Sequence, residues 1–99
     1  MSLARRAKKI DKNQQGIVWY LRGLPGVSVE VGHDDILVGY NQMTYWFEVK
    51  NPEQANKKGE VFPSALKPDQ VRIKRTWTGH YDIVTTAKEI LEIIGYPIS

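Results

Sequence analysis

The alternation of apolar and polar residues predicts three consecutive strands in the first half of the chain. Valine alternates with polar residues over 27–31, which is the two-residue period of a half-buried strand. A second strand is expected over about 35–40, and a third, rich in aromatic and β-branched residues, over 44–50. Asn41 and Gln42 stand between them as a hairpin turn. The three strands are therefore expected to form an antiparallel meander.

A helical period of apolar residues predicts three helices. The first covers residues 11–22, and the second begins at Pro68, which suits the first turn of a helix, and continues to about residue 77. Thr86 and Glu89 have the spacing of a capping box for the last helix. The residues expected to be buried by that last helix are Ala87, Ile90, Leu91 and Ile94.

The remaining segments complete one domain. Residues 51–66 show neither period and read as a long loop, and residues 81–85 as a short fourth strand. The expected order is α-β-β-β-α-β-α over residues 1–99, preceded by a basic N-terminal arm at about 1–10. A chain of this length builds a single core, so any active site must lie on its one sheet.

Composition limits the chemistry that is available. The chain has no cysteine, which excludes disulfides, thiolate zinc sites and cysteine nucleophiles. Carboxylates and two histidines remain as metal ligands, so hard cations that prefer oxygen are favoured. No apolar run approaches the ~20 residues of a membrane span, and we expect a soluble, cytoplasmic protein. Gly23 and Gly26 belong to a turn rather than to a phosphate-binding loop, so no nucleotide cofactor is expected.

Positive charge is concentrated in two places, although the net charge is only +3. One cluster lies in the N-terminal arm. The other follows the third strand and comprises Lys57, Lys58, Lys67, Arg72, Lys74 and Arg75. A solvated surface and a contact with DNA phosphates explain such clusters equally well, since basic patches are only a footprint.

Three residues have the spacing of a catalytic group. Glu48 and Lys50 are two apart on a strand and project from the same face, and a hairpin can bring Asp35 beside Glu48. Two neighbouring carboxylates repel unless a cation lies between them, and Mg²⁺ suits a site of one or two carboxylates. On spacing alone, an exposed Glu48–Lys50 ion pair with Asp35 in a turn is the simpler interpretation.

Aromatic and histidine residues are given structural roles at this stage. Trp19, Trp46 and Trp77 are expected to pack in the core or between helix and sheet rather than to stack on bases. His33 and His80 lack a partner at ligand spacing and are expected to be polar loop residues.

Three segments together resemble a known superfamily. Residues 32–38, 47–50 and 66–70 resemble the motifs of the PD-(D/E)xK nucleases, and within them of the virus-type replication-repair nuclease (VRR-NUC) family. That family has a glycine and a proline-aspartate before its second strand, ExK at the end of the third, and leucine-x-proline-x-glutamine at the next helix. Asp34 stands where the family usually has proline, so Asp35 matches the metal-binding aspartate, with Asp34 as the alternative.

The resemblance implies a fold and a set of roles. The fold is a restriction-endonuclease-like core of the α/β (α+β) class, a mixed four-stranded sheet flanked by helices. Asp35 and Glu48 would bind Mg²⁺ or Mn²⁺ with the backbone carbonyl of Val49, Lys50 would handle the attacking water, and Gln70 would reach the site from the second helix. The family also has an acid in its first helix, and Asp11 fits that role and an N-cap equally well.

The function implied by the resemblance is that of a metal-dependent DNA endonuclease in phage or prophage replication and repair. Cleavage is expected to be selective for branched DNA such as four-way junctions. Two symmetric cuts need two sites, so a homodimer is expected. The alternatives are a non-enzymatic DNA-binding or assembly module, and a nuclease subunit that requires a partner protein.

Overall fold

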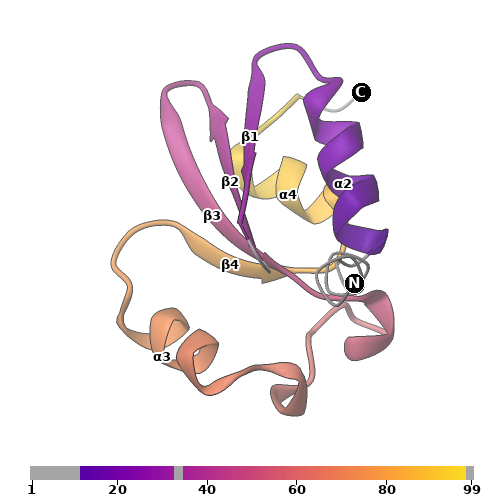
Figure 1. Ribbon diagram of the computed structural model, residues 1–99, viewed down its shortest axis with the longest axis vertical. Helices are drawn as coiled ribbons and strands as arrows, with labels where there is room; N and C mark the ends of the chain where they lie inside the picture. Colours follow the sequence, from indigo (N-terminus) through magenta and orange to yellow (C-terminus); the bar gives the residue numbers. More distant parts are fainter. Residues whose placement is uncertain (1–11, 33–34, 98–99) are drawn as a thin grey trace, which may run out of the picture.

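The computed structural model describes residues 12–32 and 35–97, and its elements have the order expected from the sequence (Figure 1). The helices and strands are α2 (Lys12–Arg22), β1 (Val27–Val31), β2 (Asp35–Tyr40), β3 (Met43–Val49), α3 (Pro68–Thr76), β4 (Tyr81–Val84) and α4 (Ala87–Ile94). In these segments no helix is long and apolar enough to cross a membrane.

The four strands form one mixed sheet in the order β1-β2-β3-β4. The first three are antiparallel neighbours, as the meander predicted, and β4 pairs with β3 in the parallel direction. The long connection from β3 to β4 contains α3 and is needed because a parallel neighbour cannot be reached by a tight turn. The expected α+β class with a mixed four-stranded sheet is confirmed.

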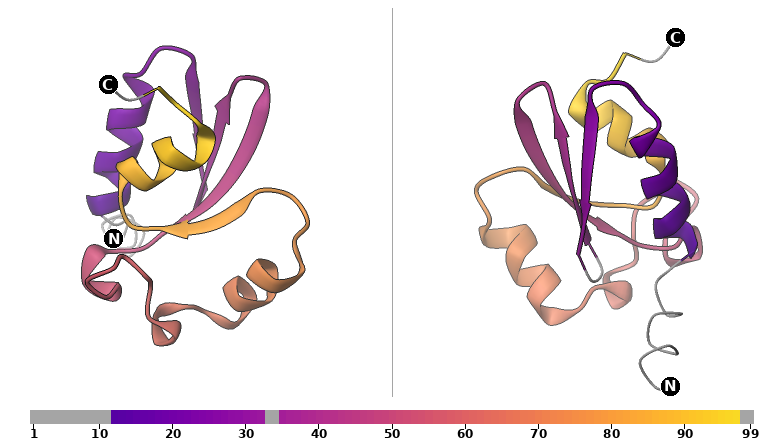
Figure 2. Two further views of the ribbon diagram at one scale, coloured as in Figure 1. Left: turned by 180° about the vertical axis from the view of Figure 1, so that it is seen from behind. Right: turned by 45° about the horizontal axis from the view of Figure 1, so that its top comes forward.

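The hydrophobic core lies on the face of the sheet that α2 and α4 cover (Figures 1 and 2). Phe47 and Ile36 are almost fully buried there, against Leu21 of α2 and Ile90 of α4. Because side chains alternate along a strand, the neighbours of Phe47 project from the other side. We call this other side, which carries Asp35, Trp46 and Glu48, the site face. The third helix, α3, lies beside β4 and apart from α2 and α4 (Figure 2).

The terminal helix confirms the prediction made from its capping box. The Thr86 side chain accepts a hydrogen bond from the Glu89 backbone N–H at 3.2 Å, and a Glu89 carboxylate oxygen accepts one from Thr86 N–H at 3.1 Å. Gly95 ends the helix in the left-handed conformation, at φ 78°. Three of the four residues expected to be buried are buried, and Ala87 is partly buried.

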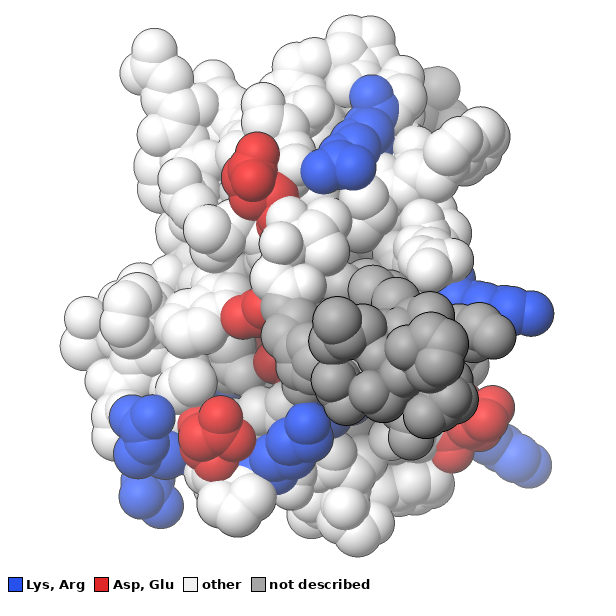
Figure 3. Space-filling view, viewed as in Figure 1, with Lys and Arg blue, Asp and Glu red and all other residues white. Residues whose placement is uncertain are grey.

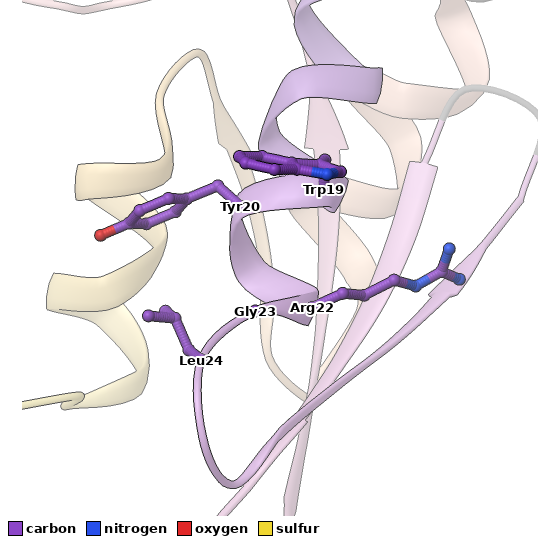
Figure 4. Close-up of a pocket in the computed structure, with 5 residues that line it drawn as sticks. All are labelled: Trp19, Tyr20, Arg22, Gly23 and Leu24. Carbon is purple, nitrogen blue, oxygen red and sulfur yellow. The ribbon is translucent and has the colours of Figure 1, made fainter.

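The expectation for Trp19 was wrong, and the loop 51–66, expected from the sequence, contains short ordered turns. Trp19 is 80% exposed, because the buried stripe of α2 runs through Ile17, Val18 and Leu21 and Trp19 projects beside it over a surface hollow (Figure 4). Residues 51–66 are not without structure: they form two short 3₁₀ helices, Pro52–Gln54 and Pro63–Ala65, and one isolated bridge.

The second helix also differs in its packing. It ends at Thr76 instead of continuing to about residue 77, and Trp77 is its C-cap. Trp77, expected to pack in the core or between helix and sheet, is 54% exposed. The buried residue of α3 is the polar Gln70.

The hairpin between β2 and β3 turns through two residues with positive φ. Asn41 has φ 54° and Gln42 has φ 67°, the pattern of a type I′ turn, whose twist matches that of the strands it joins. Asparagine tolerates this conformation well, whereas glutamine is strained in it. The turn is two residues long, so it sets the register of the pair.

Replacing Gln42 with glycine should stabilise the protein. Gln42→Gly removes the strain of the left-handed conformation, and we expect the free energy of unfolding in urea to rise by about 0.5–1 kcal/mol. The control is Gln15→Gly, at an exposed position inside α2, which should lose about 1 kcal/mol. A Gln42→Gly protein less stable than the parent would show that the turn is not strained.

Candidate active site

Asp35 and Glu48 lie directly opposite each other on β2 and β3. The Asp35 carbonyl accepts from Gly32 N–H at 2.8 Å, on the β1 side. The backbone N–H of Trp46 donates to the carbonyl of His80, just before β4, at 3.1 Å, and that of Lys50 to the carbonyl of Val84 in β4 at 2.9 Å. The Glu48 backbone between them therefore also faces β4. Asp35 and Glu48 thus form a non-hydrogen-bonded pair, the kind in which side chains approach most closely, with Cβ atoms about 4.5–5.5 Å apart.

The Asp35 carboxylate is held in place from two sides. The indole N–H of Trp46 donates to its Oδ2 at 2.7 Å, a charge-assisted hydrogen bond. The other oxygen, Oδ1, lies so close to the Gly32 Cα that a Cβ at this position would collide with it. Only glycine fits at position 32, because the Asp35 carboxylate occupies the space that a Cβ would need. This close approach explains the glycine in the sequence motif.

Glu48 and Lys50 are buried, at 4% and 8% exposure. The ladder with β4 continues through the Lys50 backbone, so strand alternation places its side chain on the site face with Glu48. Asn13 of α2 donates from Nδ2 to the Lys50 carbonyl at 2.9 Å and to the Thr85 carbonyl at 3.0 Å, which ties together the ends of β3 and β4. The interpretation of Glu48 and Lys50 as an exposed surface ion pair is wrong.

The backbone of Val49 completes the set of candidate ligands on this edge. Its side chain is buried in the core. Because the residues on either side of Val49 direct their backbone groups toward β4, its own carbonyl faces β2, the strand that carries Asp35. One backbone and two carboxylate groups, all oxygen donors, are therefore directed to one region.

Gln70 is buried, with 4% exposure. Its Oε1 accepts from Lys67 N–H at 2.9 Å within the first turn of α3. The carboxamide oxygen is thus used to cap its own helix, and the Nε2 group is the part that remains to act on a ligand. The structure supports the placement of Gln70 in a buried setting, and its catalytic role stays a prediction.

Tyr81 is a residue of this site that the sequence did not reveal. It pairs with Trp46 in the parallel register, and the two rings meet edge to face at 4.8 Å between centroids. Its hydroxyl is buried and makes no hydrogen bond within the described segments. Burial, followed by the negative charges of Glu48, Asp35 and Asp69, raises the pKa of Tyr81 from the usual 10.0 to about 12. Tyr81 is therefore a neutral hydrogen-bond donor beside the acids.

The same interactions locate the first turn of α3. Asp69, which raises the Tyr81 pKa together with the two strand carboxylates, is the acidic residue of that turn. The N-terminal end of α3 thus lies within electrostatic range of the acid pair. Gln70 follows Asp69 in this turn, and its approach to the acid pair stays a prediction.

All six residues of the second basic cluster are exposed. Exposure agrees both with a solvated surface and with a contact to DNA phosphates. In the view of Figure 3, basic side chains lie along the lower border with acidic side chains between them, and further basic side chains lie at the upper right and right. The role of Lys57, Lys58, Lys67, Arg72, Lys74 and Arg75 in DNA binding stays a prediction.

Several candidates lie outside the described residues, namely Asp11, His33, Asp34 and the basic N-terminal arm. His80 is an exposed loop residue, as expected, with its ring 4.6 Å from that of Tyr45. Within residues 12–32 and 35–97, no three His, Asp or Glu residues converge as a metal site. No third described His, Asp or Glu side chain thus joins Asp35 and Glu48 as a possible ligand.

Comparisons of the chain with protein families, with curated proteins and with solved structures found no match. The resemblance to the VRR-NUC family thus stays a prediction from three short motifs. A function for the acid pair therefore has to be inferred from the geometry and chemistry of the site residues.

The raised pKa of Tyr81 predicts a pH-dependent loss of stability. The unfolded chain ionises this phenol near pH 10 and the folded chain only near pH 12, so stability is complete below about pH 10 and falls up to about pH 12. Tyr81→Phe should reduce this fall, seen by comparing urea unfolding at about pH 9 and about pH 11. Tyr20→Phe, at an exposed position, is the control. Parallel losses in the parent and Tyr81→Phe would contradict the buried setting of the hydroxyl.

Proposed function

We propose that this chain is a divalent-cation-dependent nuclease that hydrolyses DNA phosphodiester bonds on a restriction-endonuclease-like core. The observation that carries the proposal is the non-hydrogen-bonded pairing of Asp35 with Glu48, with Lys50 buried one step further along the same face. Glu48 is buried and Asp35 partly buried, and two carboxylates held this close are costly unless a cation or proton offsets their charge.

The donor set fits Mg²⁺ or Mn²⁺. Asp35 and Glu48 would hold the ion, with the Val49 carbonyl as a third oxygen, and the remaining positions would be filled by water and substrate phosphate. Asp35 Oδ2 accepts a hydrogen bond from Trp46 and Oδ1 lies against Gly32, so the carboxylate is already positioned before an ion binds. When bound, the ion supplies a water of lowered pKa and polarises the phosphodiester.

The protein groups around the acid pair have separate tasks in this proposal. Lys50 orients the attacking water and offsets the negative charge that develops on the phosphate. Trp46 fixes the carboxylate of Asp35, and Gln70 offers its Nε2 from α3. Tyr81, neutral throughout the working pH range, keeps a buried hydroxyl donor beside the acid pair.

The substrate proposal is branched DNA, such as a four-way junction, cut by a homodimer. One acid pair per chain nicks one strand, so paired cuts need two copies related by a twofold axis. The exposed basic residues on and before α3 would contact phosphates, which attract protein without regard to base sequence. The loop 51–66, between the active-site strand and α3, is the element proposed to reach the second copy.

The alternative of a DNA-binding or assembly module without catalysis is less well supported. Binding requires exposed positive charge and gains nothing from a carboxylate pair beside the bound phosphate. The alternative of a subunit that needs a partner protein remains compatible with the same site, and the assays below separate it from a free-standing enzyme.

Removing the lysine or the glutamate should abolish cleavage while leaving the fold. Lys50→Met keeps the buried stem and removes the charge, and Glu48→Gln keeps the shape and removes a ligand. Both should cut labelled four-way-junction DNA, with Mg²⁺ or Mn²⁺, at least about 100-fold more slowly than the parent. Glu53→Gln, an exposed acid in the first 3₁₀ helix, is the matched control and should keep full activity.

Binding is measured on the same proteins to separate the alternatives. The variants should still bind junction DNA, with a log-log salt slope of roughly 0.7–0.9 per phosphate neutralised. A folded Lys50→Met protein that cuts at the parent rate would overturn the mechanism. Salt-dependent binding by a parent protein that cuts no DNA with any ion would favour the module or the partner-dependent subunit.

A further inference from the structure

A hollow of about 450 Å³ opens on the site face directly beside Asp35. Its walls are mainly apolar and come from Leu37, Trp46 and Trp77, with Glu30 and Asp35 at its border. Leu37 is 45% exposed and Trp77 is 54% exposed, which is unusual for large apolar side chains that face each other across a hollow. These residues therefore present a surface that the fold itself does not fill.

Trp77 is held in place although half of it is exposed. Its ring meets that of Trp46 edge to face, at 5.1 Å between centroids and 86° between planes. The indole also lies against the backbone at Gly79, where an added Cβ would come to 2.8 Å from its Nε1. A positioned aromatic ring with a free face can stack on a ligand at little entropic cost.

The chemistry of the hollow selects its occupant. The residues that line it include two carboxylates and no lysine or arginine, so it repels a phosphate group. A flat, uncharged ring with N–H donors suits both the apolar walls and the carboxylate border, and nucleobases have this character. Positive charge for the phosphate backbone of the DNA is available on α3, where the exposed Arg72, Lys74 and Arg75 precede Trp77.

We infer that this hollow receives one unpaired nucleobase, stacked on Trp77, of a strand whose phosphate lies at Asp35 and Glu48. The inference rests on the proposed nuclease function and narrows its substrate to DNA with an unpaired nucleotide next to the cleaved bond. A base inside an intact duplex is covered by its neighbours and cannot enter without being flipped out. Flaps, bulges and single-stranded branches supply such nucleotides, whereas a fully paired four-way junction supplies one only when a base pair opens at the exchange point.

The test compares three labelled substrates of one sequence: a paired duplex, the duplex with a single-nucleotide bulge, and the duplex with an abasic residue at the bulge. The parent protein should cut and bind the bulge in preference to the other two. Trp77→Ala should lower this preference roughly 5- to 100-fold, the usual effect of losing one stacked base, and Trp77→Phe should keep most of it. Trp19→Ala, an exposed tryptophan over a different hollow, is the control (Figure 4).

Binding in Ca²⁺ separates failure of this inference from failure of the proposed function. Cleavage that Trp77→Ala leaves unchanged on all three substrates would overturn the base pocket and leave the nuclease standing. Binding that depends on Trp77 and on the bulged base, in a protein that cuts nothing with Mg²⁺ or Mn²⁺, would support the pocket and refute the nuclease. Equal binding of base-containing and abasic bulges by the parent would overturn the pocket directly.

Discussion

The register of β2 against β3 is the constraint on which the rest of the structure depends. The same pairing that places Ile36 opposite Phe47 in the core places Asp35 opposite Glu48 on the site face. Because the side-chain period of a strand is two, a slip of one residue in either strand would expose its core residue and bury its acid in hydrocarbon. Hydrophobic burial on one face therefore holds two like charges together on the other.

Several contacts convert this pairing into a defined site. Trp46 fixes the Asp35 carboxylate, and Gly32 provides the space that the carboxylate occupies. Asn13 ties the first helix to the end of the active-site strand, so that the core side of the fold also positions Lys50. The site is thus supported from both faces of the sheet, as a catalytic constellation needs to be.

The sequence predicted the parts that depend on local periodicity. All four strands and the terminal helix lie within a residue of their expected bounds, and Asp35, Glu48 and Lys50 share one face because alternation and a two-residue turn determine it. Tyr81 could not be found in this way, because its neighbours follow from the parallel register of β4, set by a connection of about thirty residues whose course the sequence does not specify. The exposure of Trp19 was missed because its residue type was weighted above its position, which lies beside the stripe of Ile17, Val18 and Leu21.

If Asp35 and Glu48 together hold one divalent cation, calorimetric titration with Mn²⁺ in the absence of DNA should detect it. We expect the parent protein and Glu53→Gln to bind Mn²⁺, and folded Asp35→Asn and Glu48→Gln proteins to lose this binding. Binding of Mn²⁺ by a folded Asp35→Asn protein with the affinity of the parent would contradict a metal site at this acid pair, because the ion would then lie elsewhere.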